Sequence, residues 1–151
     1  MALSKLDNLY RAVILDHSSA PRHAGELKQA CVIDMNNPTC GDVIRLTVDF
    51  KEDKISDIAF SGNGCTISTA SASMMTEAVI GKTKEEALEL AAIFSQMVTG
   101  HTDSAQERLG DGQFLAGVSK FPQRVKCSTL AWNALKKAIE ADGTATVSES
   151  H

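Results

Sequence analysis

The chain lacks any long hydrophobic run. Charged residues interrupt the stretch from Met1 to Arg11 before an apolar segment of signal-peptide length develops. No later stretch reaches the length that a transmembrane helix needs. We therefore expect a protein without a membrane partner, and we expect the cytoplasm as its location.

An excess of positive charge is also missing, since the formal net charge of the 151 residues is -4. This balance argues against nucleic acid or anionic lipid as a general partner. Neither an internal repeat nor a domain linker is visible, and the length suits one domain. We place this domain at residues 1–142 and expect a disordered polar tail over residues 143–151.

Compact cysteine motifs are absent as well. The four cysteines match neither a zinc-finger spacing nor a redox Cys-x-x-C pair. In a reducing compartment, free cysteines favour metal or redox chemistry over disulfides. Three of them, Cys40, Cys65 and Cys127, together with Asp42, supply thiolates and a carboxylate that a fold can gather around one soft or borderline metal ion.

The apolar periodicity predicts an α+β domain in which a small three-stranded antiparallel sheet packs against several helices. A first helix of about a dozen residues starts near Ser4, and an irregular connection follows from Ser18 to Gly25. The later elements are predicted as strands 32–35, 43–50 and 55–60, helices 66–80, 83–98 and 123–140, and short helical turns within 100–120, one of them at 104–109. The second strand places Ile44, Leu46, Val48 and Phe50 on one face, and the charged turn from Lys51 to Lys54 predicts a hairpin.

Each candidate ligand also has a simpler interpretation. Cys40 lies in a turn between two strands, where it is a metal ligand or an ordinary loop cysteine. Cys65 follows glycines at a helix start, where unpaired amides favour a thiolate, or it is a small buried residue at the turn. Cys127 lies beside Arg124 and Lys126, whose charges favour a thiolate, but its spacing also fits the apolar face of the last helix.

The remaining cysteine and the histidines are not assigned to the site. Cys31 begins the first strand and is interpreted as a packing residue. His17 and His23 flank the connection after the first helix, where a loop or packing role is favoured over ligation. His101 is expected on the surface, and His151 lies in the tail.

Three ordered motifs, CGD at 40–42, GNGCTISTASAS at 62–73 and RVKCSTLAW at 124–132, resemble the IscU/SufU/NifU N-terminal family of iron–sulfur cluster assembly proteins. The resemblance spans about residues 6–139 and implies the same α+β fold. It is closer to the SufU branch, because Lys126 stands where the IscU branch has histidine and because the segment before the last motif, which includes residues 100–112, is longer.

The resemblance implies a zinc ion held by Cys40, Asp42, Cys65 and Cys127. A protonated lysine has no lone pair, so Lys126 does not replace the missing histidine as a ligand. Such a ligand set is negatively charged overall and needs cations nearby. Arg124 and Lys126 are the candidates, either bonded to the sulfurs or in contact with a partner.

SufU-like proteins imply a sulfur relay, in which a pyridoxal-phosphate cysteine desulfurase of the SufS type offers a persulfide. Cys40 is the expected acceptor once a partner histidine takes its place on the metal, and downstream iron–sulfur assembly proteins receive the sulfur. The chain is then an accessory protein and not a stand-alone enzyme.

Three other functions compete with the relay. One is a scaffold on which iron and a transient [2Fe–2S] cluster replace zinc on the same residues. Another is a structural zinc-binding interaction module. A hydrolytic enzyme is disfavoured, because four protein ligands close the metal to water and no histidine lies in a nucleophile-activating pattern.

Overall fold

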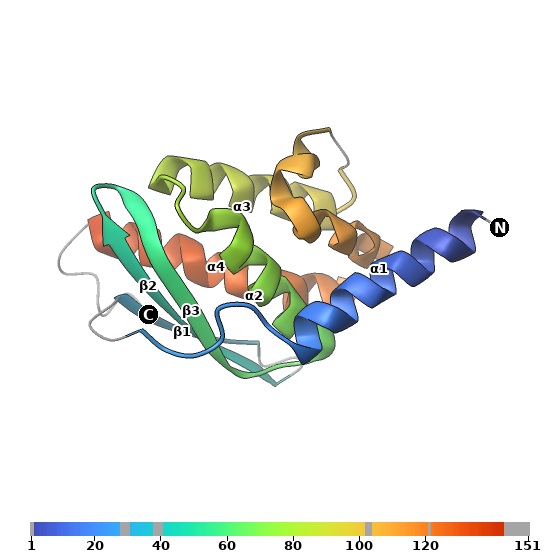
Figure 1. The fold of residues 1–151 in the computed structure, drawn as a ribbon, viewed down its shortest axis with the longest axis horizontal. Helices are drawn as coiled ribbons and strands as arrows, with labels where there is room; N and C mark the ends of the chain where they lie inside the picture. The colour runs from blue at the N-terminus through green and yellow to red at the C-terminus, as the bar shows by residue number, and fades with distance from the viewer. Residues whose placement is uncertain (1, 28–30, 38–40, 102–103, 121, 144–151) are drawn as a thin grey trace.

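Three antiparallel strands form a sheet in the order β1-β2-β3, and helices lie against one of its faces (Figure 1). The computed structural model describes residues 2–27, 31–37, 41–101, 104–120 and 122–143. Along the chain, the elements are α1 (Ala2–Ser19), β1 (Cys31–Asn37), β2 (Asp42–Lys51), β3 (Lys54–Asn63), α2 (Thr66–Val79), α3 (Lys84–Val98), η1 (Ser104–Lys120) and α4 (Pro122–Gly143). The predicted α+β architecture is confirmed.

The β2–β3 hairpin sets the register of the sheet. Its two turn residues, Glu52 and Asp53, both have positive φ angles, 51° and 72°. A two-residue turn of this kind matches the right-handed twist of the strands on either side. The hairpin predicted from the charged turn is therefore present, with strands that extend slightly beyond the predicted ranges at both ends.

One face of β2 forms part of the core, as the alternating pattern predicts. Ile44, Leu46 and Val48 are buried. Phe50 also packs against the core as predicted, although the pairing of β2 with β3 shifts between Asp49 and Phe50. Phe50 is only half-buried, and the Lys84 ammonium lies 4.9 Å from the centre of its ring.

The opposite face of the sheet is partly covered by the connection after α1. The backbone N–H of Leu27 donates to the Thr47 hydroxyl at 3.0 Å, and Thr47 is fully buried. The backbones of His23 and Gly25 exchange hydrogen bonds with Phe60 of β3. The irregular connection thus forms an extended segment along β3, which covers this part of the sheet.

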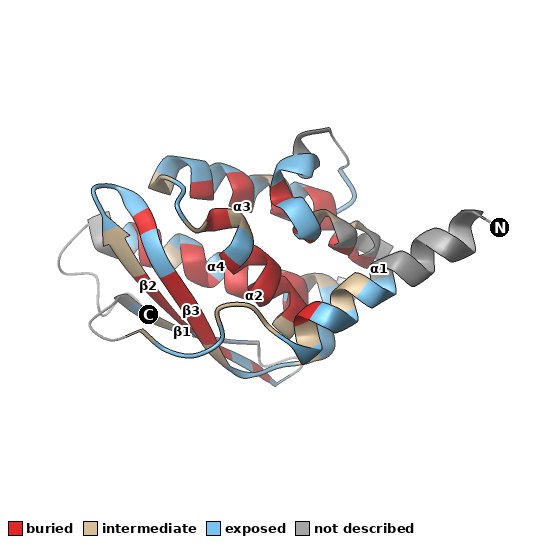
Figure 2. Ribbon diagram, in the orientation of Figure 1, coloured by how far each residue is buried: buried red, intermediate tan, exposed pale blue. Residues whose placement is uncertain are grey.

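The helices form two layers behind the sheet (Figure 1). Helices α2 and α4 contact the strands, and α3 and η1 pack on the far side of α2 and α4. Figure 2 shows that buried residues lie along strands β2 and β3 and along helices α2 and α4. Phe94 of α3 stacks on Trp132 of α4 with their ring centroids 4.8 Å apart. The largest fully buried side chains are Trp132, Phe94, Leu46, Ile55, Ile58, Met74, Met75, Leu90, Met97, Leu109, Leu115 and Leu135.

The start of α3 agrees with the helix predicted from residue 83, whereas α1 begins at Ala2, before the predicted start near Ser4. Thr83 accepts a hydrogen bond from the Glu86 backbone, and the Glu86 carboxylate accepts one from the Thr83 backbone, so the two residues form a capping box at the start of α3. Helix α4 extends to Gly143, where the tail was expected to begin, and residues 144–151 of the expected tail lie outside the described residues. None of the described helices is long and apolar enough to cross a membrane.

The end of α1 was predicted too early. Ser18 and Ser19 belong to the helix and not to the irregular connection. Their hydroxyls donate to the Leu15 carbonyl at 3.1 and 2.7 Å, so both side chains bond back onto the preceding turn. Serines that bond in this way are compatible with the last turn of a helix. His17, which precedes them, therefore lies within α1.

The segment before α4 contains the expected short helical turns. Element η1 consists of 3-10 turns interrupted at Gly110, whose φ of 61° and ψ of -131° are not helical. Glycine adopts a positive φ without a steric penalty. The kink divides η1, and Asp111 immediately follows it.

Candidate metal centre

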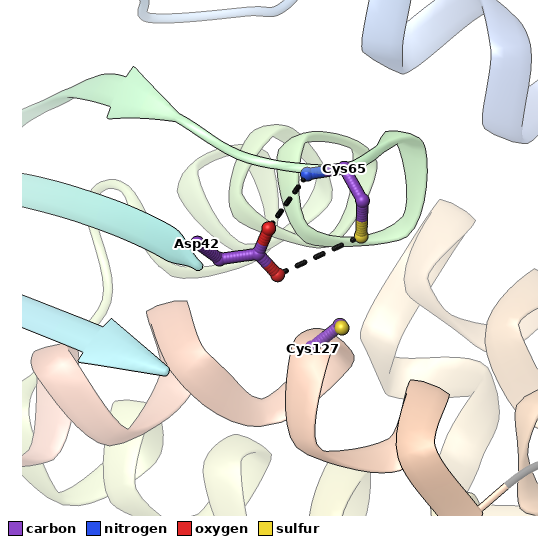
Figure 3. A group of neighbouring side chains, drawn as sticks. All are labelled: Asp42, Cys65 and Cys127. Carbon is purple, nitrogen blue, oxygen red and sulfur yellow. Dashed lines mark hydrogen bonds between the residues drawn. The ribbon is translucent and has the colours of Figure 1, made fainter. Parts of the chain in front are cut away.

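Three of the four predicted ligands come together from three different elements. Asp42 begins β2, Cys65 is the residue that caps the N-terminus of α2, and Cys127 lies near the start of α4. Their side chains point toward one another (Figure 3), and one ligand atom from each lies within 4.8 Å of the other two. The fourth predicted ligand, Cys40, lies outside the described residues.

The Asp42 carboxylate contacts both the backbone and the side chain of Cys65. The Cys65 backbone N–H donates to Asp42 Oδ1 at 2.9 Å, and the Cys65 thiol donates to Asp42 Oδ2 at 3.6 Å. The Cys65 sulfur also accepts a hydrogen bond from the backbone N–H of Ser68 at 3.4 Å, as a capping side chain does. The start of α2 therefore holds the sulfur next to the carboxylate.

Glycines before Cys65 allow the chain to pass close to its neighbours. A Cβ at Gly62, where φ is 129°, would collide with the backbone carbonyl of Val43. At Gly64 a Cβ would lie only 3.0 Å from the Ser68 hydroxyl. The backbone that approaches Gly62 is strand β2 of the same chain.

Close packing of α2 on α4 fixes the position of Cys127. The Ser71 hydroxyl of α2 donates to the backbone carbonyl of Ser128 at 2.5 Å, and both residues are fully buried. Small side chains on α2 let the two helices approach closely at this contact. Cys127, the residue before Ser128, is thereby held opposite Cys65.

The described part of the site is largely buried. Asp42 and Cys127 are each only 3% exposed. Cys65 is half-buried, and the Arg124 and Lys126 side chains in the first turns of α4 are exposed. Burial follows from the packing of α4 against α2 and β2.

The donor set fits a zinc ion. Zinc bonds of about 2.3 Å to sulfur and about 2.0–2.2 Å to oxygen place tetrahedral sulfur and oxygen ligands about 3.5 Å apart. The measured separation between Cys65 Sγ and Asp42 Oδ2 is 3.6 Å. Thiolates also bind iron in iron–sulfur clusters, so these residues are compatible with either metal.

Ser68 was not predicted to belong to this region. Its side chain is fully buried, and the hydroxyl has no hydrogen-bond partner within the described ranges. Its backbone N–H bonds to the Cys65 sulfur, so the hydroxyl lies in the first turn of α2 beside the site. Sequence alone gave no signal for it, because buried and exposed serines look alike in an Ala/Ser-rich helix.

His17 makes side-chain contacts that the sequence did not reveal. Its side chain is fully buried, and it is not a surface loop residue. Its Nδ1 lies 2.7 Å from Ser73 Oγ, and its Nε2 lies 2.8 Å from Asp111 Oδ2. These partners are 56 and 94 positions away along the chain, which is why local patterns could not identify them.

Sequence comparisons identify relatives along nearly the whole chain. The NifU-like N terminal domain matches residues 9–128. An iron-sulfur cluster assembly scaffold protein IscU from Streptococcus pyogenes serotype M1 is 67% identical over 145 residues, which cover 96% of this chain and 91% of the relative. The zinc-dependent sulfurtransferase SufU of Bacillus subtilis (strain 168) is 53% identical over 136 residues, which cover 90% and 92% of the two chains.

Solved structures agree with this assignment. The crystal structure of a putative SUF-system scaffold protein from Fervidobacterium islandicum AW-1 superposes with a TM-score of 0.80 at 38% identity, and covers 84% of this chain and 93% of the other. A NifU-like N-terminal domain from Brucella abortus, at 21% identity, has the same fold with a TM-score of 0.81 and covers 89% and 94% of the two chains. Together with the sequence matches, these similarities show that the chain belongs to the NifU-like N-terminal domain family of iron–sulfur cluster assembly proteins.

Proposed function

We propose that the chain is a zinc-bound sulfur acceptor that works with a cysteine desulfurase in iron–sulfur cluster assembly. The observation that carries the proposal is the convergence of Asp42, Cys65 and Cys127, whose ligand atoms lie within 4.8 Å of one another. Cys40, two residues before Asp42, is the fourth proposed ligand. The Bacillus subtilis relative, at 53% identity, bears the name of a zinc-dependent sulfurtransferase.

Zinc, when bound, supplies a redox-inert positive charge that keeps the cysteines as thiolates and protects them from oxidation. The Cys40 thiolate attacks the outer sulfur of the desulfurase persulfide. One S–S bond forms on Cys40 as the S–S bond of the partner breaks, and the partner leaves as a thiolate. Because sulfur moves with its proton and no net oxidation occurs, the step needs no further reactant.

The described geometry supports Cys40 as the acceptor by showing how firmly the other two cysteines are held. The Cys65 sulfur accepts the Ser68 amide, and the Cys65 backbone is bonded to Asp42. Cys127 is 3% exposed, in a helix that is tied to α2. A ligand that must leave the metal to reach a partner is therefore better supplied by Cys40, which precedes strand β2.

The exposed cations near the start of α4 provide a contact surface for the partner. Arg124 and Lys126 are both exposed, and an anionic persulfide or an acidic surface patch complements their charge. We propose that they guide the desulfurase, and a histidine of the desulfurase would serve as a ligand in place of Cys40 if zinc is bound. A cytoplasmic location and a downstream assembly protein as sulfur recipient remain predictions.

The scaffold function is the alternative with specific support. The relative at 67% identity is named an iron-sulfur cluster assembly scaffold protein, and two thiolates with a carboxylate can also hold an iron–sulfur cluster. In that case, Cys40, Asp42, Cys65 and Cys127 bind the cluster as cargo while it is built. The two roles use the same residues and differ in what these residues carry.

Two measurements on the purified protein distinguish these roles. Elemental analysis should give one zinc per chain for a relay. Anaerobic incubation with iron, cysteine and the desulfurase should then produce a protein persulfide without the visible absorption of a cluster. A stable coloured [2Fe–2S] product would instead establish the scaffold role, and zinc without either product would leave a structural module.

A further inference from the structure

A second group of metal-ligating side chains lies where α1, α2 and η1 meet. His17 of α1, Glu77 of α2 and Asp111 of η1 each offer a ligand atom, and these atoms lie within 4.8 Å of one another. None of the three belongs to the sulfur-rich centre, which is the group of Asp42, Cys65 and Cys127 described above. Because the residues come from three elements that are distant in sequence, the fold itself creates the group.

The histidine is oriented as a metal ligand would be. Its side chain is fully buried, with Nε2 2.8 Å from Asp111 Oδ2 and 4.0 Å from Glu77 Oε1. On the opposite side of the ring, Nδ1 lies 2.7 Å from Ser73 Oγ. Metal-binding histidines use one ring nitrogen for the ion and fix the ring by a hydrogen bond from the other.

The Ser73 hydroxyl is itself held in place from outside the group. The backbone N–H of Arg22 donates to Ser73 Oγ at 2.8 Å. With Nε2 bound to an ion, the Nδ1–H of His17 can donate to this oxygen. Without an ion, Nε2–H donates to Asp111, and Nδ1 accepts from the Ser73 hydroxyl. The same arrangement therefore suits the imidazole in both states.

The two carboxylates make the group accessible from solvent. The side chains of Glu77 and Asp111 are 46% and 49% exposed, whereas that of His17 is buried. An ion can approach from the carboxylate side and meet the imidazole at the base of the group. The exposed Glu77 side chain can also rotate to shorten its distance from the ion.

The charge of the group favours a divalent cation. Glu77 and Asp111 contribute two carboxylates beside the imidazole of His17. The nearest cation on the connection, Arg22, is hydrogen-bonded to Asp16 at 2.6 Å, and this bond raises the pKa of Arg22, with weaker contributions from Glu77 and Asp111. Arg22 thus interacts electrostatically with the two carboxylates, while its guanidinium forms an ion pair with Asp16.

We propose that His17, Glu77 and Asp111 bind a divalent first-row metal ion of the Mn²⁺ or Fe²⁺ type, with water completing its coordination. One nitrogen and two carboxylate oxygens form a harder donor set than the thiolates of the sulfur-rich centre. Adjacent ligands of a six-coordinate ion with bonds of about 2.1 Å lie about 3 Å apart, close to the 2.8 Å between His17 Nε2 and Asp111 Oδ2.

The ion has a structural consequence for the rest of the protein. It links η1 directly to α1 and to α2, and α2 carries Cys65 at its N-terminus. An ion that binds only the folded protein stabilises it in proportion to the logarithm of its concentration. Occupancy of this site is therefore expected to hold η1 against the helix that begins at the sulfur-rich centre.

Titration of the zinc-loaded full chain with Mn²⁺, followed by the paramagnetic resonance of the free ion, tests the proposal. Mn²⁺ competes poorly for thiolates, so the sulfur-rich centre does not contribute. We expect one Mn²⁺ bound per chain and a thermal midpoint that rises with Mn²⁺. Asp111→Asn and Glu77→Gln should each weaken binding at least about tenfold. Glu107→Gln, an exposed acid in the same segment, is the matched control and should bind normally.

Asp111→Asn separates metal binding from a purely structural contact, because the asparagine carbonyl still accepts the Nε2–H of His17. Failure to bind Mn²⁺ at millimolar concentration, or equal binding by the wild type and both carboxylate variants, would overturn the proposal. Loss of stability in Asp111→Asn with unchanged Mn²⁺ binding would also overturn it. The readout needs no desulfurase, so it is independent of the proposed sulfur relay.

Discussion

The Asp42 carboxylate joins the start of β2 to the start of α2 through Cys65. Its Oδ1 accepts the Cys65 backbone N–H at 2.9 Å, and its Oδ2 lies 3.6 Å from the Cys65 sulfur. One oxygen thus has a structural partner while the other lies beside the sulfur. The two roles of Asp42 can be separated by substitution.

Asp42→Asn and Asp42→Ala should both retain less zinc than the wild type, but the two variants should differ from each other in stability. The asparagine carbonyl can still accept the Cys65 amide, whereas alanine leaves this N–H without its partner and should cost about 1–3 kcal/mol. Urea unfolding of the metal-free proteins measures this difference, and elemental analysis measures zinc. Equal zinc content in Asp42→Asn and the wild type would exclude the carboxylate as a ligand.

Ser71→Ala should loosen the contact between α2 and α4. It removes the buried hydrogen bond to the Ser128 carbonyl, with an expected loss of about 1 kcal/mol in unfolding free energy. Ser128→Ala is the control, because its hydroxyl donates to the Val125 carbonyl within the same helix and its loss should change stability less. Similar losses in the two variants would show that the Ser71 contact does not hold the helices together.

The Glu86 capping contact should make stability depend on acidity. The backbone hydrogen bond from Thr83 lowers the pKa of Glu86 below its ordinary value of 4.5. Because the pKa of Glu86 is lower in the folded state, its contribution to the free energy of unfolding is complete at pH values above the ordinary pKa. This contribution is lost as the pH falls through the lowered pKa of the folded state. The stability difference between wild type and Glu86→Gln should therefore shrink in acid. Glu85→Gln, a neighbour in the same first turn, should follow the wild type; a constant difference for Glu86→Gln would contradict the assignment.

Arg124→Glu and Lys126→Glu should weaken the response of the desulfurase to this protein. If the exposed cations guide the partner, reversal of either charge should raise the concentration needed for half-maximal stimulation about tenfold, and added salt should reduce the difference. Lys136→Glu, also exposed on α4, provides the control. Unchanged stimulation by both variants, with normal zinc content, would remove these residues from the contact surface.

Local signals were sufficient for most of the fold and for part of the site. The Thr83–Glu86 pair and the turn at Glu52 and Asp53 identified a helix start and a hairpin, because both depend on neighbouring residues. The convergence of Asp42, Cys65 and Cys127 was expected from their resemblance to a known family and not from their spacing, which is too long to define a compact motif.

Contacts between distant elements escaped the sequence. The bonds from His17 to Ser73 and Asp111 join three elements, and no periodicity encodes such a meeting. The covering of Thr47 by Leu27 likewise depends on how an irregular connection lies against the sheet. The burial of Asp42 depends likewise on the packing of distant elements, whereas that of Cys127 agrees with one of its two interpretations, because its spacing fits the apolar face of α4.

Mapping of the transferred sulfur tests the central claim most directly. The zinc-loaded protein is incubated with cysteine and the desulfurase, alkylated and analysed by peptide mass spectrometry, with Cys40→Ser and Cys31→Ser in parallel. The account predicts one additional sulfur on the peptide that contains Cys40 in wild type and Cys31→Ser, and none in Cys40→Ser. Sulfur on Cys65 or Cys127 in the wild type, or undiminished loading of Cys40→Ser, would contradict it.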